Sequence, residues 1–133
     1  MKLPKNKCPF DNLLRFGNLP PVLVYPAKRG WFLQIIPNKY PAVGHGECSL
    51  ILKKGLYKSR SGTGFHELVI LKDHNRYLAE YSATEIKKIL MAYRERYLGL
   101  AKDKCVQYIS IFHNHGKEAG STVPHLHSQI LAL

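Results

Sequence analysis

The segment His125-Leu126-His127-Ser128-Gln129 places two imidazoles and an amide on alternate residues. Side chains of a β-strand alternate between its two faces, so His125, His127 and Gln129 would share one face. A neutral histidine is a good nucleophile toward phosphorus, because one ring nitrogen can attack while the other holds a hydrogen bond that fixes the tautomer. The segment therefore predicts a nucleophilic histidine on a rigid strand.

The Gln129 amide can donate a hydrogen bond to a phosphoryl oxygen, but it cannot supply a proton as an acid. We therefore expect transfer to a phosphate acceptor, which needs little proton transfer, in preference to hydrolysis. The preceding loop, residues 114–124, holds Gly116, Gly120, Ser121 and Thr122 together with Lys117. Glycines let backbone N–H groups approach a phosphate, and hydroxyls and a cation add to its binding. The loop is predicted to bind phosphate.

The elements around this segment predict an α+β domain with a mainly antiparallel sheet and one long helix packed on it. Ser82 and Glu85 form a capping box and Gly99 is a stop signal, which predicts a helix over about residues 82–99. Ile89, Tyr93 and Tyr97 are expected on its core-facing side. Strands are predicted at residues 22–25, 31–36, 67–71, 106–112 and 125–133, with a glycine-rich loop and one short strand near Leu50 over residues 42–64. One domain over residues 1–133 is expected.

Charge and composition narrow the class of partner. The chain has 133 residues and 20 basic against 9 acidic side chains, a formal charge of +11 that favours an anionic partner. The basic residues are scattered and no RNA-binding aromatic motif is present, which disfavours nucleic acid. No apolar run approaches the roughly 20 residues of a membrane span, and no signal peptide follows Met1, so a cytoplasmic location is expected. The three cysteines argue against a disulfide framework and favour a metal ligand or buried thiols.

Residues 114–121 and 124–130 resemble the active-site segment of galactose-1-phosphate uridylyltransferases, the branch of the histidine-triad superfamily whose motif ends in glutamine. Residues 37–42, 62–70 and 73–75 add supporting similarity, and the resemblance runs from Cys8 onward. It implies a histidine-triad-like fold and a double displacement through a covalent nucleotidyl-histidine.

By this resemblance the catalytic residues are His127, which attacks the α-phosphorus of a nucleoside diphosphate sugar, and Gln129, which binds phosphoryl oxygens. The resemblance and the loop chemistry together give the expected substrate-binding residues Asn38, Asn114, Gly120, Ser121, Thr122 and Gln129. A sugar 1-phosphate is released and a second phosphate accepts the nucleotidyl group. His66, His113 and His115 are expected to be polar residues near the pocket.

The implied activity is that of a UDP-hexose:hexose-1-phosphate uridylyltransferase of galactose metabolism. Two alternatives stay open. One is an ADP-sugar or dinucleoside-polyphosphate phosphorylase, which uses the same intermediate. The other is a non-catalytic module that binds nucleotide or nucleic acid. The family's full enzymes carry two such domains, so this chain could be a fragment, a minimal relative or a subunit that completes its site as a homodimer.

The resemblance also implies a structural zinc site. The family holds zinc with a Cys-x-x-Cys pair, a distant histidine and the first histidine of the final motif. The matching residues here are Cys8, Asp11, His74 and His125. Asp11 replaces the second cysteine, and a carboxylate oxygen can also bind zinc. These four residues are the predicted metal ligands.

Overall fold

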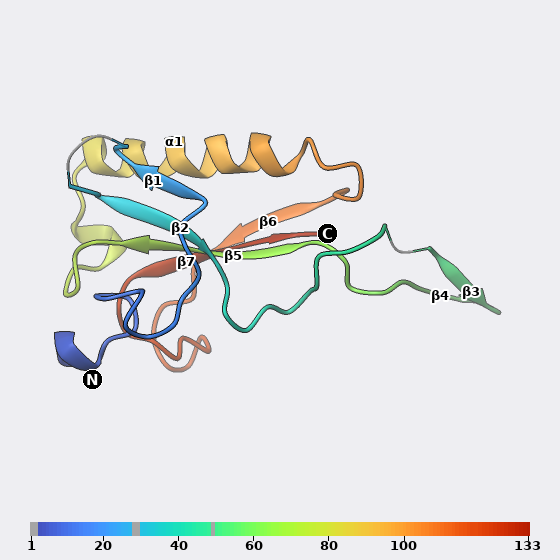
Figure 1. The fold of residues 1–133 in the computed structure, drawn as a ribbon, viewed down its shortest axis with the longest axis horizontal. Helices are drawn as coiled ribbons and strands as arrows, with labels where there is room; N and C mark the ends of the chain where they lie inside the picture. Colours follow the sequence, from blue (N-terminus) through green and yellow to red (C-terminus); the bar gives the residue numbers. More distant parts are fainter. Residues whose placement is uncertain (1–2, 28–29, 49) are drawn as a thin grey trace.

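The computed structural model describes residues 3–27, 30–48 and 50–133 and contains a five-stranded antiparallel sheet (Figure 1). Its strand order is β1-β2-β5-β7-β6, and helix α1, Ala83–Leu100, packs on one face. The sheet strands are β1 (Leu23–Tyr25), β2 (Leu33–Pro37), β5 (Phe65–Leu71), β6 (Ile109–Phe112) and β7 (His127–Ala132). Short 3-10 helices lie at Lys5–Lys7 (η1) and Leu78–Glu80 (η2). The α+β prediction is confirmed.

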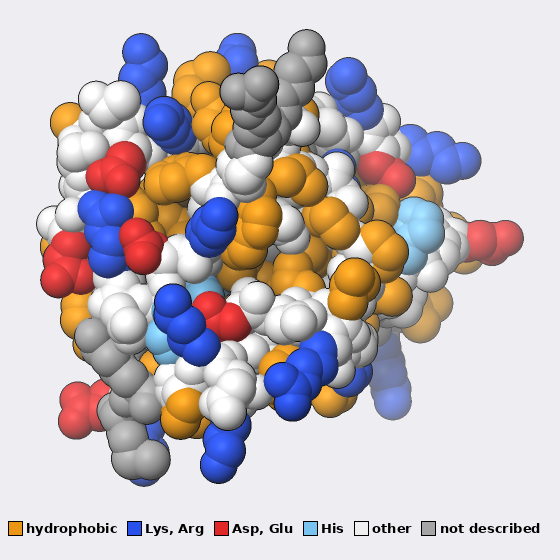
Figure 2. Space-filling view, turned by 60° about the vertical axis from the view of Figure 1, so that its left-hand side comes forward, with side chains coloured by type: hydrophobic (Ala, Val, Ile, Leu, Met, Phe, Trp, Pro, Cys, Tyr) orange, Lys and Arg blue, Asp and Glu red, His pale blue; other side chains and the backbone are white. Residues whose placement is uncertain are grey.

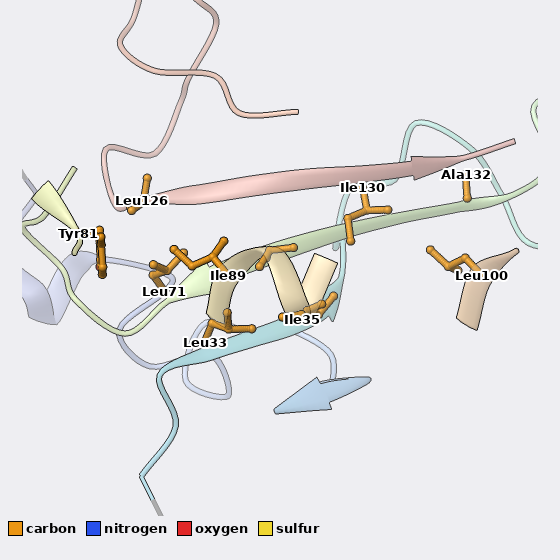
Figure 3. Packing of buried hydrophobic residues seen from close by; sticks show 11 residues of the cluster. Leu33, Ile35, Leu71, Tyr81, Ile89, Leu100, Leu126, Ile130 and Ala132 are labelled. Atoms are coloured by element: carbon orange, nitrogen blue, oxygen red, sulfur yellow. The ribbon is translucent and has the colours of Figure 1, made fainter. Parts of the chain in front are cut away.

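The side of the sheet that faces α1 carries the larger apolar core. Alternate residues of β2, β5 and β7 point to this side, and Ile89 and Ala92 of α1 pack against them (Figure 3). The buried strand residues of this cluster are Leu33, Ile35, Val69, Leu71, Ile130 and Ala132. Burial of this apolar surface holds the helix on the sheet.

The opposite side of the sheet carries a smaller core. There the N-terminal residues Cys8 and Phe10 pack against Ile36, Leu68 and Ile70. The side chains of these strand residues point to the face opposite α1, so the sheet divides the interior into two separate clusters. The odd-numbered face of β7, which carries His127 and Gln129, lies on this second side.

Polar contacts fix the ends of α1. The predicted capping box is present, since Ser82 Oγ accepts from the Glu85 backbone N–H and the Glu85 carboxylate accepts from the Ser82 N–H. Arg76 donates to the same carboxylate. Further along, Arg96 donates to the buried Glu67 of β5 at 2.5 and 2.6 Å. The Arg96–Glu67 pair joins the helix to the sheet, and the other contacts fix where the helix begins.

The prediction that Tyr97 faces the core is wrong, because its side chain is 44% exposed. Each step of four residues rotates a helical position by about 40°, so the series Ile89, Tyr93, Tyr97 drifts to the edge of the buried stripe. Arg96 takes the inward position at this level and pairs with Glu67. Tyr93 keeps its inward position and donates its hydroxyl to Ser128 Oγ at 2.6 Å.

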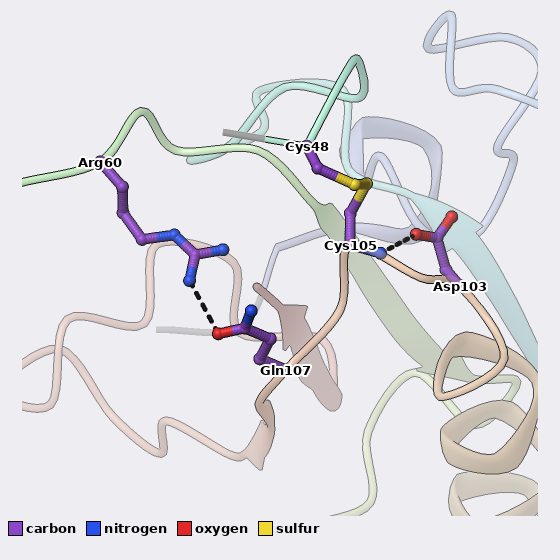
Figure 4. The surroundings of a disulfide bond; sticks show 5 residues. All are labelled: Cys48, Arg60, Asp103, Cys105 and Gln107. Carbon is purple, nitrogen blue, oxygen red and sulfur yellow. Dashed lines mark hydrogen bonds between the residues drawn. A yellow bond between two sulfur atoms is a disulfide. The ribbon is translucent and has the colours of Figure 1, made fainter. Parts of the chain in front are cut away.

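Residues 42–64 differ from the prediction. They form a two-stranded hairpin, β3 (Leu52–Lys54) with β4 (Tyr57–Ser59), which extends away from the sheet (Figure 1). The segment is also tied to the turn after α1, because Cys48 and Cys105 form a disulfide bond with their Cα atoms 5.0 Å apart (Figure 4). The expectation that the cysteines form no disulfide is therefore wrong, while the expectation of a buried thiol holds for Cys8, which is free and buried.

The boundaries of the five sheet strands also differ from the predicted ranges, by up to three residues at one end. β6 begins at Ile109 because residues 103–106 form a turn, in which the Val106 N–H donates to Asp103 O. β7 begins at His127, so His125 precedes the strand.

The distribution of basic side chains on the surface agrees with the prediction that they are scattered. On the face shown in Figure 2, the Lys and Arg side chains are spread out, with apolar and neutral side chains between them. None of the helices in the described ranges is long and apolar enough to cross a membrane.

We predict that Gly64→Ala destabilises the protein by about 1–3 kcal/mol, the usual cost of overpacking. A Cβ at Gly64 would overlap the backbone carbonyl of Ala132, so β5 and β7 would have to separate. Gly46→Ala is the control, because nothing lies within 4 Å of a Cβ at that position. Urea denaturation of both variants measures the difference, and equal stability would contradict the prediction.

We also predict a pH-dependent role for Glu85. Hydrogen bonds from Arg76 and from Ser82 lower the pKa of its carboxyl to about 2. The stabilisation is therefore fully present above the unfolded pKa of about 4.5 and is lost as the pH falls toward 2. Glu85→Gln should lower the Tm at pH 7 and match wild type near pH 2. The exposed Glu95→Gln is the control, and an equal loss at both pH values would argue against this account.

Candidate functional site

The predicted catalytic residues lie on a central strand of the sheet. β7 pairs with β5 on one side and β6 on the other, and its register sets His127 opposite Ile70 and Gln129 opposite Leu68. Both side chains lie on the same side of the sheet, as the alternation predicted, and this is the side away from α1. A strand with neighbours on both sides holds its side chains in fixed directions.

Backbone contacts determine which nitrogen of His127 can react. Its Nδ1 lies 2.9 Å from the carbonyl oxygen of His125. A carbonyl can only accept, so Nδ1 carries the proton and the lone pair is on Nε2. Burial lowers the pKa of His127, which keeps the ring neutral at pH 7. Phe10 packs against the ring with its centroid 5.0 Å away. Nε2 is thus the ring nitrogen whose lone pair is available.

His113 supports the backbone of the same residue. Its Nδ1 donates to His127 O at 2.7 Å, from the end of β6. It was predicted as a polar residue near the pocket, and the structure adds its contact with the predicted nucleophile. The sequence carried no signal for it, because the contact depends on how the chain leaves β6 beside β7.

Two cavities meet at His127. One, of about 550 Å³, is lined by the loop after β6 and includes Asn114, Gly120, Ser121 and Thr122. The other, of about 450 Å³, includes Asn38 and Gln129. Thr122, Val123 and His127 line both cavities. The structure therefore brings every predicted substrate-binding residue to the surroundings of His127.

The two cavities differ in character. The larger one is lined by His113, His115 and Lys117, which offer donors and positive charge. The aromatic rings of Phe10, Phe16 and Tyr40 line the smaller one.

The loop that lines the larger cavity turns at two glycines. Gly116 and Gly120 both have φ of 81°, a conformation that favours glycine. The Ser121 N–H donates to Gly116 O, and the Ser121 hydroxyl donates to Val123 O. These bonds hold the loop in shape, while the exposed Thr122 stands between the cavities.

The four predicted metal ligands form one cluster. Cys8, Asp11, His74 and His125 each offer a ligand atom, and these atoms lie within 4.8 Å of one another. Cys8 Sγ is 3.4 Å from His125 Nδ1, which is 3.7 Å from Asp11 Oδ2. In a tetrahedral zinc site, bonds of about 2.0–2.3 Å separate neighbouring ligand atoms by roughly 3.3–3.8 Å. These two separations fall within that range, whereas His74 Nδ1 and Asp11 Oδ2 lie closer together than that.

Backbone carbonyls orient both histidines of this cluster. His125 Nε2 donates to Leu71 O and His74 Nε2 donates to Leu3 O, each at 2.6 Å. Each ring therefore presents the lone pair of Nδ1 to the cluster. In metal sites the other ring nitrogen of a ligating histidine usually donates to a carbonyl or carboxylate in this way.

The remaining atoms of the cluster also suit a cation. His74 Nδ1 and Asp11 Oδ2 are buried and face each other, and neither has a hydrogen-bond partner among the described residues. Two acceptors in contact repel unless a proton or metal lies between them. Burial raises the pKa of the Cys8 thiol, and a bound cation would reverse this by stabilising the thiolate.

The chain is similar to known nucleotide-sugar enzymes. It is 35% identical over 106 residues to an ADP-glucose phosphorylase of Arabidopsis thaliana, covering 77% of this chain and 30% of that protein. It is 34% identical over 97 residues to a galactose-1-phosphate uridylyltransferase of Thermotoga maritima, covering 71% of this chain and 30% of that protein. The chain thus spans less than a third of the length of either relative.

Solved structures give the same picture. The crystal structure of the Arabidopsis thaliana ADP-glucose phosphorylase with bound ADP-glucose superposes with a TM-score of 0.78 at 30% identity, over 95% of this chain and 40% of that one. A histidine triad protein from Clostridium difficile matches at a TM-score of 0.57 and 22% identity, over 98% of this chain and 94% of that one, which shows the fold alone.

The family model described as the N-terminal domain of galactose-1-phosphate uridyl transferase matches residues 34–133. This range contains the strand with His127 and Gln129, the loop before it and Asn38, while Cys8 and Asp11 lie ahead of it. The chain belongs to the galactose-1-phosphate uridylyltransferase family.

Proposed function

We propose that this chain carries a nucleotidyl-transfer site in which His127 Nε2 forms a covalent bond to a nucleoside monophosphate. The observation that supports this most directly is the hydrogen bond from His127 Nδ1 to His125 O, which leaves the Nε2 lone pair at the junction of two cavities. The membership of the family supports the same chemistry.

The proposed reaction has two displacements at the same phosphorus. The Nε2 lone pair attacks the α-phosphorus of a nucleoside diphosphate sugar, and the bond to the sugar 1-phosphate breaks. The leaving phosphate is stable as an anion, so glutamine in place of an acid at position 129 is sufficient. A second phosphate oxygen then attacks phosphorus, and the electron pair of the P–N bond returns to Nε2. The His125 carbonyl stabilises the positive charge on the ring of the intermediate through Nδ1–H.

We assign the two halves of the substrate to the two cavities. The aromatic cavity with Phe10, Phe16 and Tyr40 suits a nucleoside base, because a base can stack on aromatic rings. The cavity with His113, His115 and Lys117 suits a sugar phosphate. In this assignment Asn38 contacts the nucleoside, while Gln129 and the loop with Asn114, Gly120, Ser121 and Thr122 contact phosphate.

We propose a UDP-hexose:hexose-1-phosphate uridylyltransferase activity in galactose metabolism as the first candidate, in keeping with the family. An ADP-sugar phosphorylase is the second candidate, because the Arabidopsis thaliana ADP-glucose phosphorylase aligns at 35% identity and a TM-score of 0.78. Since each relative is over three times as long as the region matched, a second domain or a partner subunit in a homodimer would complete the sugar site.

We further propose that Cys8, Asp11, His74 and His125 hold a structural zinc ion. Such an ion would link three parts of the chain: the N-terminal segment with Cys8 and Asp11, the turn after β5 with His74, and His125 just before β7. When bound it supplies charge neutralisation and rigidity. The chain's own contribution is the position of His125, whose carbonyl oxygen orients the nucleophile.

We predict that His127→Ala abolishes covalent labelling. Wild type is incubated with UDP-glucose or ADP-glucose labelled at the α-phosphorus, then denatured and analysed for acid-labile label on protein. The preferred nucleotide should be the one that labels faster. His45→Ala is the control, because this exposed histidine lies outside both cavities and should keep full labelling. No label from either nucleotide would leave the non-catalytic binding module as the function.

We also predict about one zinc per wild-type chain, which Cys8→Ala would reduce strongly. A chelator should lower the Tm of wild type more than that of Cys8→Ala, because metal binding adds to folding stability. Cys48→Ala controls for the loss of a cysteine outside the cluster and should keep its zinc. Metal analysis by mass spectrometry measures the content, and equally little zinc in wild type and Cys8→Ala would rule the site out.

A further inference from the structure

A histidine that the proposed reaction does not use directly contacts the catalytic glutamine. His66 lies on β5, on the same side of the sheet as Gln129, and its Nε2 is 2.8 Å from Gln129 Oε1. Accepting the nucleotidyl-transfer function proposed above, we infer that His66 is a positioning residue. It holds the Gln129 amide so that the NH₂ group faces the phosphoryl oxygens of the substrate.

The tautomer of His66 follows from a backbone group. The backbone N–H of Ala42 donates to His66 Nδ1 at 2.9 Å. A backbone N–H can only donate, so Nδ1 carries the lone pair and the neutral ring carries its proton on Nε2. His66 is therefore a donor toward Gln129.

A donor at this position determines the orientation of the glutamine amide. The His66 Nε2–H can be accepted only by Gln129 Oε1, which turns the Nε2 group of Gln129 away from His66. The register puts His66 opposite Leu131, while His127 lies opposite Ile70. His66 thus lies on the side of Gln129 away from His127. The NH₂ group of Gln129 is left to face the smaller cavity, which Gln129 and His127 both line.

Gln129 uses Oε1 for its contact with His66 and lines the smaller cavity, so its NH₂ group can donate to a ligand there. A reversed amide would set its oxygen against phosphoryl oxygens, two acceptors that repel. The His66 contact thus prepares the donor before substrate binds, which is the condition for electrostatic stabilisation of a transition state.

The ring of His66 is itself held by the turn after β2. Asn38 Oδ1 accepts from the Tyr40 N–H at 3.0 Å, and Asn38 Nδ2 lies against the ring, 3.4 Å from His66 Nδ1 and 3.2 Å from Nε2. With the proton on Nε2, only Nδ1 has a lone pair that can accept from Asn38. The Asn38 N–H also donates to His66 O. Asn38 lines the same cavity as Gln129. The turn after β2 therefore has two roles. It presents Asn38 to the nucleoside and, through His66, it orients Gln129 toward phosphate.

A double-mutant cycle tests whether His66 acts through Gln129. The single-turnover rate of covalent labelling is measured for wild type, His66→Leu, Gln129→Ala and the double variant. We expect His66→Leu to slow labelling by about 10-fold, the size of effect usual when a partner that orients a functional side chain is lost. The double variant should be as slow as Gln129→Ala alone, because the orienting bond has nothing left to orient. A further 10-fold loss in the double variant would overturn the proposal.

His66→Gln is the conservative variant. Its side-chain amide can replace the Nε2–H donor, so it should recover most of the rate lost in His66→Leu, whereas a role in packing alone would give no such recovery. His45→Ala, an exposed histidine outside the cavities, should label at the wild-type rate. A His66→Gln rate no better than that of His66→Leu would count against the proposal.

A second measurement separates this proposal from the function on which it rests. Long-range ¹H–¹⁵N spectra of the unliganded protein report the tautomer of His66 without any reaction. We expect the proton on Nε2, and a shift of the Gln129 side-chain amide signals in His66→Leu. A proton on Nδ1 would overturn the orientation. If wild type takes no label, the nucleotidyl-transfer function fails, and the spectrum still decides how His66 and Gln129 are oriented.

Discussion

Two histidines that lie two residues apart each donate a hydrogen bond to a backbone carbonyl, but from different ring nitrogens. As a result, Nδ1 of one and Nε2 of the other keep their lone pairs. His125 donates from Nε2 to Leu71 O, and His127 donates from Nδ1 to the carbonyl of His125 itself. Carbonyl groups cannot become donors, so both tautomers are set by the course of the main chain. His125 presents Nδ1 to the cluster of metal-ligand candidates, and His127 presents Nε2 to the cavities. The proposed metal site and the proposed nucleophile depend on the same short piece of backbone.

The sheet gives that piece of backbone its rigidity. β7 lies between β5 and β6, and polar contacts reach it from outside the ladder, from His113 to His127 O and from Tyr93 to Ser128 Oγ. The side chains on the other face of β7, Ile130 and Ala132, pack into the core beneath α1. The larger core and the proposed catalytic side chains therefore lie on opposite faces of one strand. The period-two alternation of a strand makes this division possible.

Features carried by local patterns could be predicted from the sequence. The capping box of Ser82 and Glu85 located the helix, and the alternation of His127 and Gln129 located the polar face. The predicted ligands Cys8, Asp11, His74 and His125 come from distant parts of the chain, and family resemblance supplied their grouping. Contacts between residues far apart in the sequence could not be predicted where no such motif links them. The Cys48–Cys105 disulfide and the contact from His66 to Gln129 depend on which segments the topology brings together.

The central claim is that the main chain gives His125 and His127 opposite tautomers. Long-range ¹H–¹⁵N spectra of protein labelled at histidine test it at neutral pH, with signals assigned through His125→Gln and His127→Gln. We predict a protonated Nε2 for His125 and a protonated Nδ1 with an unprotonated Nε2 for His127. The same tautomer in both residues, or a proton on His127 Nε2, would contradict the account.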